Sequence, residues 1–500
     1  MDHFPNSRRI ALKQLVSLSA VGALALLRSG KAGAAAPAAV PAAGIPGVVG
    51  PITSRSDASY ESLRQALVWH RSKPNRFPDM IVPVRSEAEV ASVIKFAAQN
   101  KLKIAIRSGG HNPTGASLRD GGICLDLSGL TDIQVDKQRQ IASVQTGVRA
   151  IQLVSRLAED DLTFPTAHCM TVGMGGYLLG GGIGWNHTYR SGMATFSIEG
   201  AELVLADGRR VVVNATENPD LYWAVRGGGP GLFAAVTRFQ LKAYPLPKAI
   251  RVSSYILPLD KLATMTSTLD KLAPGKDPRL EILALLMHNP EAPPDAPPEQ
   301  SKICFLTAFA FGYSVEESRA MLAPLAQSPI ASEAVVKEED QPFTLMELFP
   351  KFFSTATPGG YMGRYAAESA ITDEPGKILH DMSDHFRTAR SPICHVIASY
   401  GLNLQLHADA CFSSIAKHYV GCFAIWDDEK DDEFYYRWLE QATTYMDPYA
   451  KGHYVNEVEG QRHPERIRLC YSPENWQRLQ ALRQKYDPQG VFHTYLGQPA

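Results

Sequence analysis

Several kinds of feature are missing from this 500-residue chain, and each absence narrows what the protein can be. The seven cysteines include no C-x-x-C pair, so no zinc or other metal site is expected. The formal net charge is −1 and becomes −5 without residues 1–34, which hold five basic residues and one acidic residue. This balance argues against nucleic acid or a charged membrane surface as a partner. No long apolar run follows residue 34, so no membrane span is expected in the mature protein.

The stretch 104–111, I-A-I-R-S-G-G-H, predicts a buried strand that ends in two glycines and then presents a histidine. Two glycines permit positive φ and allow a bulky group to approach the backbone. The imidazole of His111 can serve as a base, a metal ligand or a nucleophile. From these residues alone, a tight turn with a solvated histidine is the simpler interpretation.

A second stretch is rich in glycine, with C-M-T-V-G-M-G-G at 169–176 and G-G-G-I-G at 180–184. Seven glycines within residues 173–184 argue against a helix or an ordinary strand. Such a loop exposes backbone N–H groups that suit a pyrophosphate, although the dinucleotide-binding fingerprint is not matched. A floppy surface loop is disfavoured because six large apolar residues there require burial: Val172, Tyr177, Leu178, Leu179, Ile183 and Trp185.

Together these stretches resemble the berberine bridge enzyme-like FAD-linked oxidases, which have a PCMH-type FAD-binding domain and belong to the vanillyl-alcohol-oxidase superfamily. The matching motifs are R-S-G-G-H at 107–111, C-x-T-V-G-x-G-G at 169–176 and G-G-G-x-G at 180–184. L-Y-W-A-V-R-G-G-G at 221–229, Y-V-N-E at 454–457 and K-Y-D-P at 485–488 follow in the family's order. The resemblance runs from about residue 76 to the C-terminus. It departs from the family pattern at 196–197, 232, 234 and 412–415, which leaves the fine contacts and the substrate preference open.

The resemblance implies FAD held by two covalent bonds, one from His111 to the flavin 8α-methyl carbon and one from Cys169 to C6. These residues lie 58 positions apart, which suits the bicovalent branch of the family. The other residues that it implies for cofactor binding are Arg107, Ser108, Gly109, Gly110, Thr171, Val172, Gly173, Gly175, Gly176, Gly180, Gly181, Gly182, Gly184, Val236, Tyr454 and Asn456. Six cysteines then remain, mostly in apolar settings that favour buried free thiols, and one disulfide stays open.

The first 34 residues predict an export signal. S-R-R-I-A-L-K at 7–13 resembles the twin-arginine signature, an apolar run follows at 15–27, and A-G-A at 32–34 suits a peptidase. The alternative is an ordinary N-terminal anchor helix. The twin-arginine route carries folded proteins, which suits a bacterial flavoprotein that is periplasmic or secreted. Residues 35–55, rich in alanine and proline at their start, are expected to form a disordered spacer.

The rest predicts an α+β fold with a two-part FAD-binding domain, at 56–247 and 446–500, and an inserted substrate-binding domain at 248–445. Strands at 80–83 and 104–107 flank a helix from 87 to about 100, which S-E-A-E at 86–89 opens as a capping box. A hairpin is predicted at 202–213, around Asp207-Gly208. Strands at 252–257, 280–287 and 302–313, with helices between them, predict an antiparallel sheet backed by helices.

The catalytic residues are less clearly marked. Residues 402–407 alternate, so a strand would place Asn403, Gln405 and His407 on one face. That face is either a solvated edge or, as the resemblance implies, the surface over the flavin ring. Tyr454 is the first candidate base, with Glu457, Gln405 and His407 around it, but its pKa would have to fall from about 10.

The resemblance implies an oxidase that removes hydride from an alcohol, or amine-adjacent, C–H of a bulky small-molecule substrate, with O₂ reduced to H₂O₂. One alternative is a flavin dehydrogenase that uses a quinone or protein acceptor. A second is a flavin-binding protein without turnover. Val172 matches a family position at which valine leaves room for oxygen beside the flavin and leucine fills it.

Overall fold

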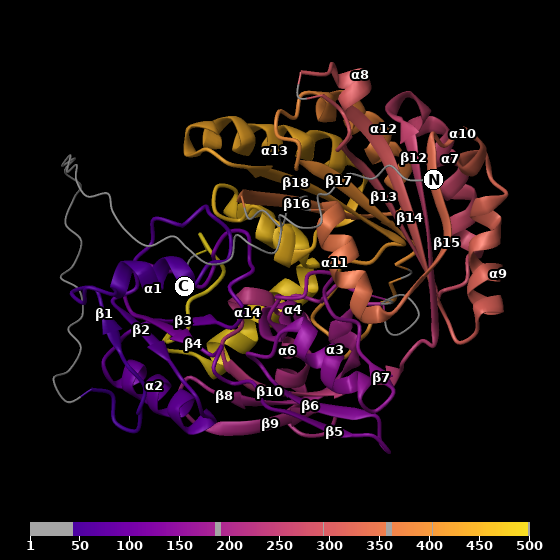
Figure 1. The fold of residues 1–500 in the computed structure, drawn as a ribbon. Coiled ribbons are helices and arrows are strands. Elements are labelled where there is room, and N and C mark those ends of the chain that lie inside the picture. The colour runs from indigo at the N-terminus through magenta and orange to yellow at the C-terminus, as the bar shows by residue number, and fades with distance from the viewer. Residues whose placement is uncertain (1–43, 186–191, 294, 357–362, 403, 499–500) are drawn as a thin grey trace. The chain divides into compact units, whose positions relative to one another are not determined.

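The structure is a computed structural model that describes residues 44–498, except 186–191, 294, 357–362 and 403 and the side chains of 353–356. Its first elements are β1 (Thr53–Ser54), α1 (Tyr60–Ala66), β2 (Met80–Pro83), α2 (Glu87–Gln99), β3 (Ile104–Arg107) and β4 (Ile123–Asp126). They form a four-stranded sheet in the order β1-β2-β4-β3 (Figure 1). Because β4 runs parallel to both neighbours, β2, α2 and β3 make up the predicted βαβ unit, whose second strand leads to His111.

Helix α2 begins where the sequence predicts, because Ser86 caps its N-terminus. The Ser86 hydroxyl accepts a hydrogen bond from the Glu89 backbone N–H at 3.2 Å. The Glu89 carboxylate accepts from the backbone N–H groups of Arg85 and Val49, at 2.7 and 3.0 Å, rather than from that of Ser86. Only half of the predicted capping box is therefore formed, and its acidic residue instead ties the preceding segment to the helix.

That contact corrects the expectation of a disordered spacer for the described residues 44–55. Ile45 is only 2% exposed and packs in the core beneath α2. Thr53 pairs with Ile81, so β1 is an edge strand of the first sheet. The low-complexity composition ends before these residues, and burial of Ile45 with backbone pairing stabilises them.

The second sheet is antiparallel and has the order β5-β6-β10-β8-β9. Its elements and their neighbours are β5 (Ile133–Asp136), β6 (Ile141–Gln145), α3 (Ala150–Ala158), β7 (Leu162–Thr163), β8 (Ile198–Val204), β9 (Arg210–Asn214), α6 (Pro219–Val225), β10 (Ala235–Lys242) and β11 (Tyr244–Pro245). The predicted hairpin is β8–β9, and Gly208 at its turn has φ of +79°. This sheet and the first lie in the lower part of Figure 1.

The third sheet is antiparallel, with eight strands in the order β15-β12-β14-β13-β17-β18-β16-β19. Its elements are β12 (Ala249–Pro258), α7 (Leu262–Leu272), β13 (Leu280–His288), α8 (Pro298–Ser301), β14 (Lys302–Gly312), α9 (Val315–Ala326), α10 (Pro329–Glu333), β15 (Val336–Phe343), α11 (Leu345–Ala356), β16 (Arg364–Thr372), α12 (Pro375–Arg387), β17 (His395–Tyr400), β18 (His418–Trp426), α13 (Asp432–Met446) and β19 (Ala450–Gly452). The sheet and its helices confirm the predicted α+β fold class.

The two faces of this sheet have different partners. Helices α7, α9, α12 and α13 cover one face, where Val396 and Cys422 pack into a large apolar core. The opposite face carries Ile397, Tyr419 and Phe423, and it packs with α11 in a separate cluster. Figure 1 shows α11 on the inner side of the sheet, next to α3. Side chains of β17 and β18 therefore alternate between the helix layer and the interior of the molecule.

Two predicted elements are wrong. Leu402 and residues 404–407 form no strand, and Leu406 is 70% exposed, so no polar face exists there. Asn403 lies outside the described residues. The glycine-rich stretch does contain a short helix, α4 (Met174–Leu179), because burial of Met174, Tyr177 and Leu178 offsets the low helix propensity of its glycines.

The C-terminus returns to the first half of the chain. Helix α14 (Pro473–Tyr486) is capped by Ser472, whose hydroxyl accepts from the Asn475 backbone N–H at 3.2 Å. The tail then runs beside β3, where the Ile104 backbone N–H donates to the Val491 carbonyl at 2.7 Å. The end of the chain thus flanks the strand that leads to His111.

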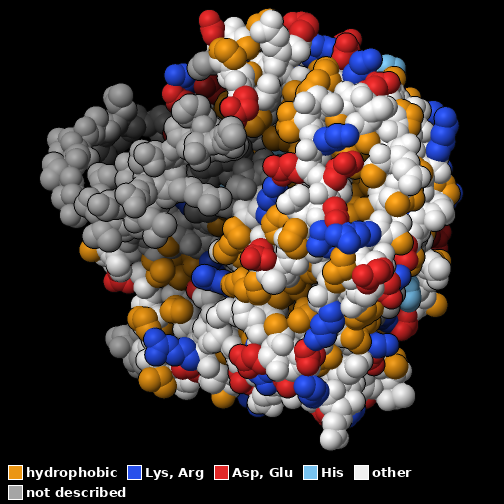
Figure 2. Space-filling view, turned by 45° about the vertical axis from the view of Figure 1, so that its right-hand side comes forward, with side chains coloured by type: hydrophobic (Ala, Val, Ile, Leu, Met, Phe, Trp, Pro, Cys, Tyr) orange, Lys and Arg blue, Asp and Glu red, His pale blue; other side chains and the backbone are white. Residues whose placement is uncertain are grey.

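The described surface is mixed in charge. On the face shown in Figure 2, lysine and arginine side chains alternate with acidic ones, and hydrophobic atoms lie between them. Among the described residues, no helix is long and apolar enough to cross a membrane. All seven cysteines lie in described parts of the chain and are free thiols, six of them buried and Cys169 half-buried.

Candidate active site

The loop after β3 is held against the glycine-rich stretch by contact between two glycine backbones. A Cβ on Gly109 would lie 2.5 Å from the nitrogen of Gly173, and a Cβ on Gly173 would lie 2.7 Å from the Gly109 Cα. No side chain fits at either position, so glycine is required for the close approach. This contact explains why two motifs far apart in sequence lie side by side.

Arg107 and Ser108 fix the shape of the same loop. The Arg107 guanidinium pairs with Asp126 at 3.2 Å and donates to the carbonyls of Leu67 and Ser108 at 3.2 and 3.1 Å. The Ser108 hydroxyl donates to the Thr146 carbonyl at 2.7 Å. Both side chains line the cavity described below, but most of their hydrogen bonds go to backbone carbonyl groups of the protein.

His111 is held on two sides. Its ring stacks on Trp69, with 4.8 Å between centroids, and the Trp69 indole N–H donates to the His111 carbonyl at 3.0 Å. Its Nε2 lies 2.9 Å from the Thr171 hydroxyl oxygen. Burial, followed by the charges of Arg107 and Arg149, lowers the pKa of His111 to about 3. The imidazole is therefore neutral at physiological pH.

Thr171 links His111 to Cys169. The Cys169 Sγ lies 3.4 Å from the same Thr171 hydroxyl oxygen that contacts His111 Nε2. One hydroxyl thus contacts a nitrogen and a sulfur that the sequence places 58 positions apart. Both His111 and Cys169 line one cavity, whereas Thr171, which is exposed, is not among the residues that line it.

The predicted glycines divide into two groups. Gly109, Gly110, Gly173, Gly175 and Gly176 line the cavity, and a Cβ on Gly176 would meet no atom within 4 Å. The others, Gly180, Gly181, Gly182 and Gly184, do not line it and instead allow close packing against Asn456, Phe412, Tyr177 and the Thr166 carbonyl respectively. The run at 180–184 therefore shapes the protein core rather than the cavity surface.

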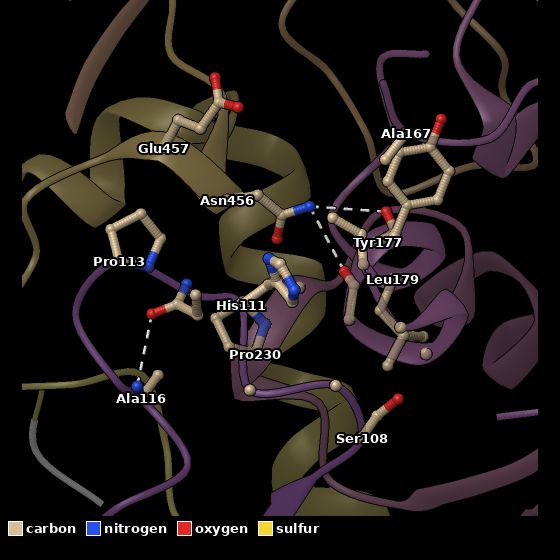
Figure 3. A pocket seen from close by; sticks show the side chains of 18 of the residues that line it. Ser108, His111, Pro113, Ala116, Ala167, Tyr177, Leu179, Pro230, Asn456 and Glu457 are labelled. Atoms are coloured by element: carbon tan, nitrogen blue, oxygen red, sulfur yellow. Dashed lines mark hydrogen bonds between the residues drawn. The ribbon is translucent and has the colours of Figure 1, made fainter. Parts of the chain in front are cut away.

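The cavity has a volume of about 380 Å³ and extends between three parts of the chain. One wall comes from 104–119 and 167–183, and another from 454–457. The far end is lined by Gly229, Pro230 and Val236 together with His493 from the C-terminal tail. In Figure 3, Glu457 lies at one end of the view, Ser108 lies at the other, and Asn456 and His111 lie between them.

Asn456 joins the C-terminal motif to the glycine-rich helix. Its Nδ2 donates to the carbonyls of Gly176 and Tyr177, at 3.3 and 3.5 Å, as Figure 3 shows. It also donates to the Tyr454 hydroxyl oxygen at 2.9 Å. Tyr454 and Asn456 therefore fix the wall of the cavity through hydrogen bonds with each other and with α4.

The pKa shifts reverse the predicted order of candidate bases. Burial, followed by the charge of Glu457, raises the pKa of Tyr454, which is the opposite of what a tyrosine base requires. Burial also raises the pKa of Glu457, to about 7, although a hydrogen bond from the Tyr419 hydroxyl opposes the shift. Of the two, only Glu457 has the proton affinity of a base that works near neutrality.

The inner face of the large sheet supplies the remaining wall of the cavity. Its residues come from β13, β16, β17, β18 and α11: Leu283, Phe352, Tyr365, His395, Ile397, Ser399, Tyr419, Phe423 and Ile425. Gln405 and His407 are not among the residues that line the cavity. His407 instead stacks on Phe196, with 4.0 Å between ring centroids. The described part of the predicted polar row at 402–407 therefore does not line the cavity, and the sheet residues that do are mostly aromatic and aliphatic.

Several cavity residues carried no sequence signal. His168 precedes Cys169 and bonds through Nε2 to the Glu281 carboxylate at 2.8 Å. Trp69, Tyr365 and Tyr419 lie outside every motif, and only the tertiary fold brings them to the cavity. His493 alone could have been found, because it follows the K-Y-D-P motif in the tail.

Comparison with known proteins relates this chain to FAD-dependent enzymes. Residues 78–214 match the family of the FAD binding domain. The FAD-linked oxidoreductase nodO of Hypoxylon pulicicidum is 28% identical over 445 residues, which cover 87% of this chain and 94% of that protein. The chain is an FAD-linked oxidoreductase. The (R)-6-hydroxynicotine oxidase of Paenarthrobacter nicotinovorans is 35% identical over 228 residues, or 45% of this oxidoreductase and 49% of the relative.

Solved structures show the same fold. The 6-hydroxy-D-nicotine oxidase of Arthrobacter nicotinovorans aligns with a TM-score of 0.77 at 21% identity, covering 91% of this oxidoreductase and 98% of that chain. BBE-like 1 of Physcomitrella patens aligns with a TM-score of 0.75 at 20% identity, covering 90% and 96%. Phl p 4.0202, described as a glucose dehydrogenase, aligns with a TM-score of 0.75 at 18% identity, covering 89% and 95%. A Phl p 4 variant with valine in place of isoleucine is described as a glucose oxidase.

The residues present in the oxidoreductase fit FAD. The backbone at Gly176 is open to the cavity, as a close ligand contact requires. A neutral imidazole and a thiol converge at one end. At the other end, the buried Nε2 of His493 has no hydrogen-bond partner in the described part of the chain, so it is available to a ligand.

Proposed function

We propose that this chain binds FAD covalently through His111 and Cys169 and works as an oxidase. The observation that carries the proposal is the convergence of both residues on the Thr171 hydroxyl at the cavity wall. A neutral imidazole has one unprotonated ring nitrogen, whose lone pair can form the bond to the flavin. Arg107, Ser108 and the glycines at 109, 110, 173, 175 and 176 would hold the cofactor, with Val236 at the far end.

When bound, FAD supplies the acceptor for a hydride taken from a C–H next to oxygen or nitrogen. The protein must then accept a proton from the substrate O–H or N–H. Glu457 takes that role because it lines the cavity and because burial raises the pKa of its carboxyl to about 7. The Tyr419 hydroxyl donates to the carboxylate and orients it. Tyr454, our first candidate from the sequence, positions Asn456 and the Gly182 backbone N–H instead.

Oxygen is the proposed electron acceptor, and Val172 supports that choice. This side chain lines the cavity three residues after Cys169. One extra methylene in a close-packed site removes the space that O₂ requires. Phl p 4.0202 is described as a glucose dehydrogenase and an isoleucine-to-valine variant of Phl p 4 is described as a glucose oxidase, which agrees with a link between valine and reaction with oxygen.

A dehydrogenase that passes electrons to a quinone or protein is the second candidate, because Phl p 4.0202 has the same fold. Reoxidation of the reduced protein separates the two. Rapid reoxidation in oxygenated buffer with release of H₂O₂ supports the oxidase. Slow reaction with O₂ and fast reaction with a quinone would make the chain a dehydrogenase.

Acid precipitation of the purified protein, followed by mass spectrometry, tests the covalent bonds. The flavin should remain with the protein, and His111→Ala and Cys169→Ala should each leave one bond. The double variant should release FAD. Free flavin from the unmutated protein would refute the assignment.

We also propose that residues 1–34, outside the described residues, direct export by the twin-arginine route to a periplasmic or extracellular location. The R-R pair, apolar run and A-G-A site occur together. Replacement of Arg8 and Arg9 by lysine should keep the protein in the cytoplasm with its flavin bound. Normal export of that variant would point to another route.

A further inference from the structure

Glu457 lies at the substrate side of the cavity, among residues from several elements. It ends the short segment Val455–Glu457, and its carboxylate accepts a hydrogen bond from Tyr419 on β18. Its charge raises the pKa of Tyr365 on β16 and of Tyr454. The remaining titratable group that faces it is His168, whose charge would lower the pKa of Glu457. Glu457 therefore lies near His168, the residue before Cys169, where the flavin ring is proposed to attach.

This carboxylate lacks a cationic partner. In the described part of the chain, no lysine or arginine forms an ion pair with Glu457. The two arginines that line the cavity, Arg107 and Arg119, donate to backbone carbonyls, and Arg107 also pairs with Asp126. A buried carboxylate without a countercharge is unfavourable unless it is protonated or a ligand supplies the charge.

The wall that the large sheet supplies is mostly aromatic and aliphatic. Rings of Phe352, Tyr365 and Phe423 line it, together with Leu283, Ile397 and Ile425. The rings of Tyr365 and Phe423 lie 5.9 Å apart between centroids and are tilted by 50°, so they are neighbouring aromatic groups in this wall. Such a surface favours a flat apolar ring, and it also attracts a cation through the faces of the aromatic rings.

From this geometry we propose that the substrate is an arylalkylamine, with its nitrogen on an alkyl carbon, bound as an ammonium ion that pairs with Glu457 while its ring packs on Tyr365 and Phe423. The proposal rests on the oxidase function above and specifies its substrate class. It disfavours carboxylate and phosphate substrates, because they would repel Glu457 and because no lysine or arginine lies in the described part of this sheet wall. It also disfavours sugars, because most groups in this wall cannot bond their hydroxyls.

The reaction that follows is balanced. An N–H bond of the ammonium breaks and its proton forms an O–H bond on Glu457, which leaves a nitrogen lone pair. The neighbouring C–H bond then breaks, its two electrons leave as hydride to FAD, and the lone pair forms a C=N bond. The amine is thus oxidised by two electrons to an iminium ion, and O₂ is the final oxidant.

Isothermal titration calorimetry of the flavin-loaded protein tests the class without turnover. The probe is benzyltrimethylammonium, whose charge is permanent, and the comparison ligands are benzyl alcohol, benzoate and glucose. At pH 8 the cation should bind roughly 10- to 100-fold more tightly than the alcohol, while benzoate and glucose give no measurable heat. Because burial raises the pKa of Glu457 to about 7, cation binding at pH 7 should release up to about half a proton, and at pH 9 almost none.

Variants assign the effect to Glu457. Glu457→Gln should lose both the preference for the cation and the proton release. Ser399→Ala, a change in the same wall that involves no charge, should keep both. His168→Asn should also keep the proton release. If proton release is instead lost in His168→Asn and kept in Glu457→Gln, the proposal is wrong.

The substrate class can fail without the oxidase function. If the protein carries covalent flavin and an alcohol or sugar reduces it, while the cation binds no more tightly than benzyl alcohol, the amine proposal is wrong and the oxidase proposal stands. Flavin reduction by N-methylbenzylamine, with little or none by benzyl alcohol, supports both. A protein without covalently bound flavin counts against the proposed function.

Discussion

At the scale of single residues, the sequence motifs indicated His111 and Cys169, which line one cavity, but they placed Tyr454 before Glu457 as the candidate base. His111 and Cys169 each belong to a short, unbroken sequence motif, so their convergence could be predicted from the family resemblance. The choice between Tyr454 and Glu457 could not be predicted from the sequence, because it depends on burial and on Tyr419, which is distant in sequence. A pKa is set by the surroundings of a group in the folded chain, and those surroundings carry no local signature.

Thr171 is expected to position both covalent bonds. Thr171→Val keeps the shape of the side chain but removes the oxygen that contacts His111 and Cys169. We expect the fraction of protein with two bonds to fall, with singly attached flavin in its place, as measured by intact mass after acid precipitation. Thr444→Val, on the exposed side of α13, is the matched control. Full double attachment in Thr171→Val would reduce Thr171 to a packing residue.

Val172→Leu is expected to slow the reaction with oxygen. The added methylene extends a side chain that already lines the cavity and packs against the core, so free space beside it should be lost. Stopped-flow mixing of the photoreduced protein with oxygenated buffer should show reoxidation slower by at least roughly tenfold, the effect of about 1.4 kcal/mol on a barrier. Anaerobic reduction by substrate should hardly change. Equal reoxidation rates for the two proteins would show that the size of residue 172 does not control the reaction with oxygen.

At the scale of elements, the alternation of apolar and polar residues in the sequence predicted the helices and strands that bury only one face. The βαβ unit from β2 to β3 follows its predicted bounds closely, because its periodicity is explicit. The hairpin β8–β9 turns at the predicted Asp207-Gly208, but β8 begins at Ile198 rather than at 202. Strand β17 was missed because both of its faces are buried, so H-V-I-A-S-Y shows no polar alternation. The segment 402–407 alternates better and is not a strand, because Leu406 is exposed to solvent. Helix α4 was missed because tertiary burial outweighs propensity.

Gly421 in β18 is expected to position Tyr419 over Glu457. A Cβ at this position would meet the Tyr419 hydroxyl and lie 2.8 Å from Phe423 Cε2, so alanine must displace one of these rings. Gly421→Ala should destabilise the fold by about 1–3 kcal/mol in urea unfolding, as overpacking does. It should also raise the pKa of Glu457, because the Tyr419 hydrogen bond that lowers it is lost.

Calorimetric proton release separates these two effects of Gly421→Ala. The pH midpoint of proton release on binding of benzyltrimethylammonium should move upward in Gly421→Ala and also in Tyr419→Phe. Gly275→Ala is the control, because a Cβ there meets no atom within 4 Å. A loss of stability with an unchanged midpoint would limit Gly421 to packing.

At the scale of the whole molecule, buried charges tie the C-terminal segment to the large sheet. Arg466 pairs with Glu368 on β16 at 3.0 Å and with Asp447 at 2.7 Å. The Glu368 side chain is only 2% exposed, and its carboxylate also accepts from the Glu459 backbone N–H at 3.1 Å. The residues between Asp447 and Arg466 include Tyr454, Asn456 and Glu457, so this network fixes both ends of the segment that builds the cavity wall.

Arg466→Met is therefore expected to destabilise the protein and to loosen the site. Methionine keeps much of the apolar stem but leaves Glu368 buried without its countercharge, which costs about 3–5 kcal/mol. Urea unfolding followed by tryptophan fluorescence measures the loss. Arg437→Met is the matched control, because the Arg437–Glu433 pair is about two-thirds exposed on both sides, and exposed pairs contribute about 0–1 kcal/mol. If both variants unfold at the same urea concentration as the unmutated protein, the network does not hold the C-terminal segment, and the position of Glu457 depends on Tyr419 and Asn456 alone.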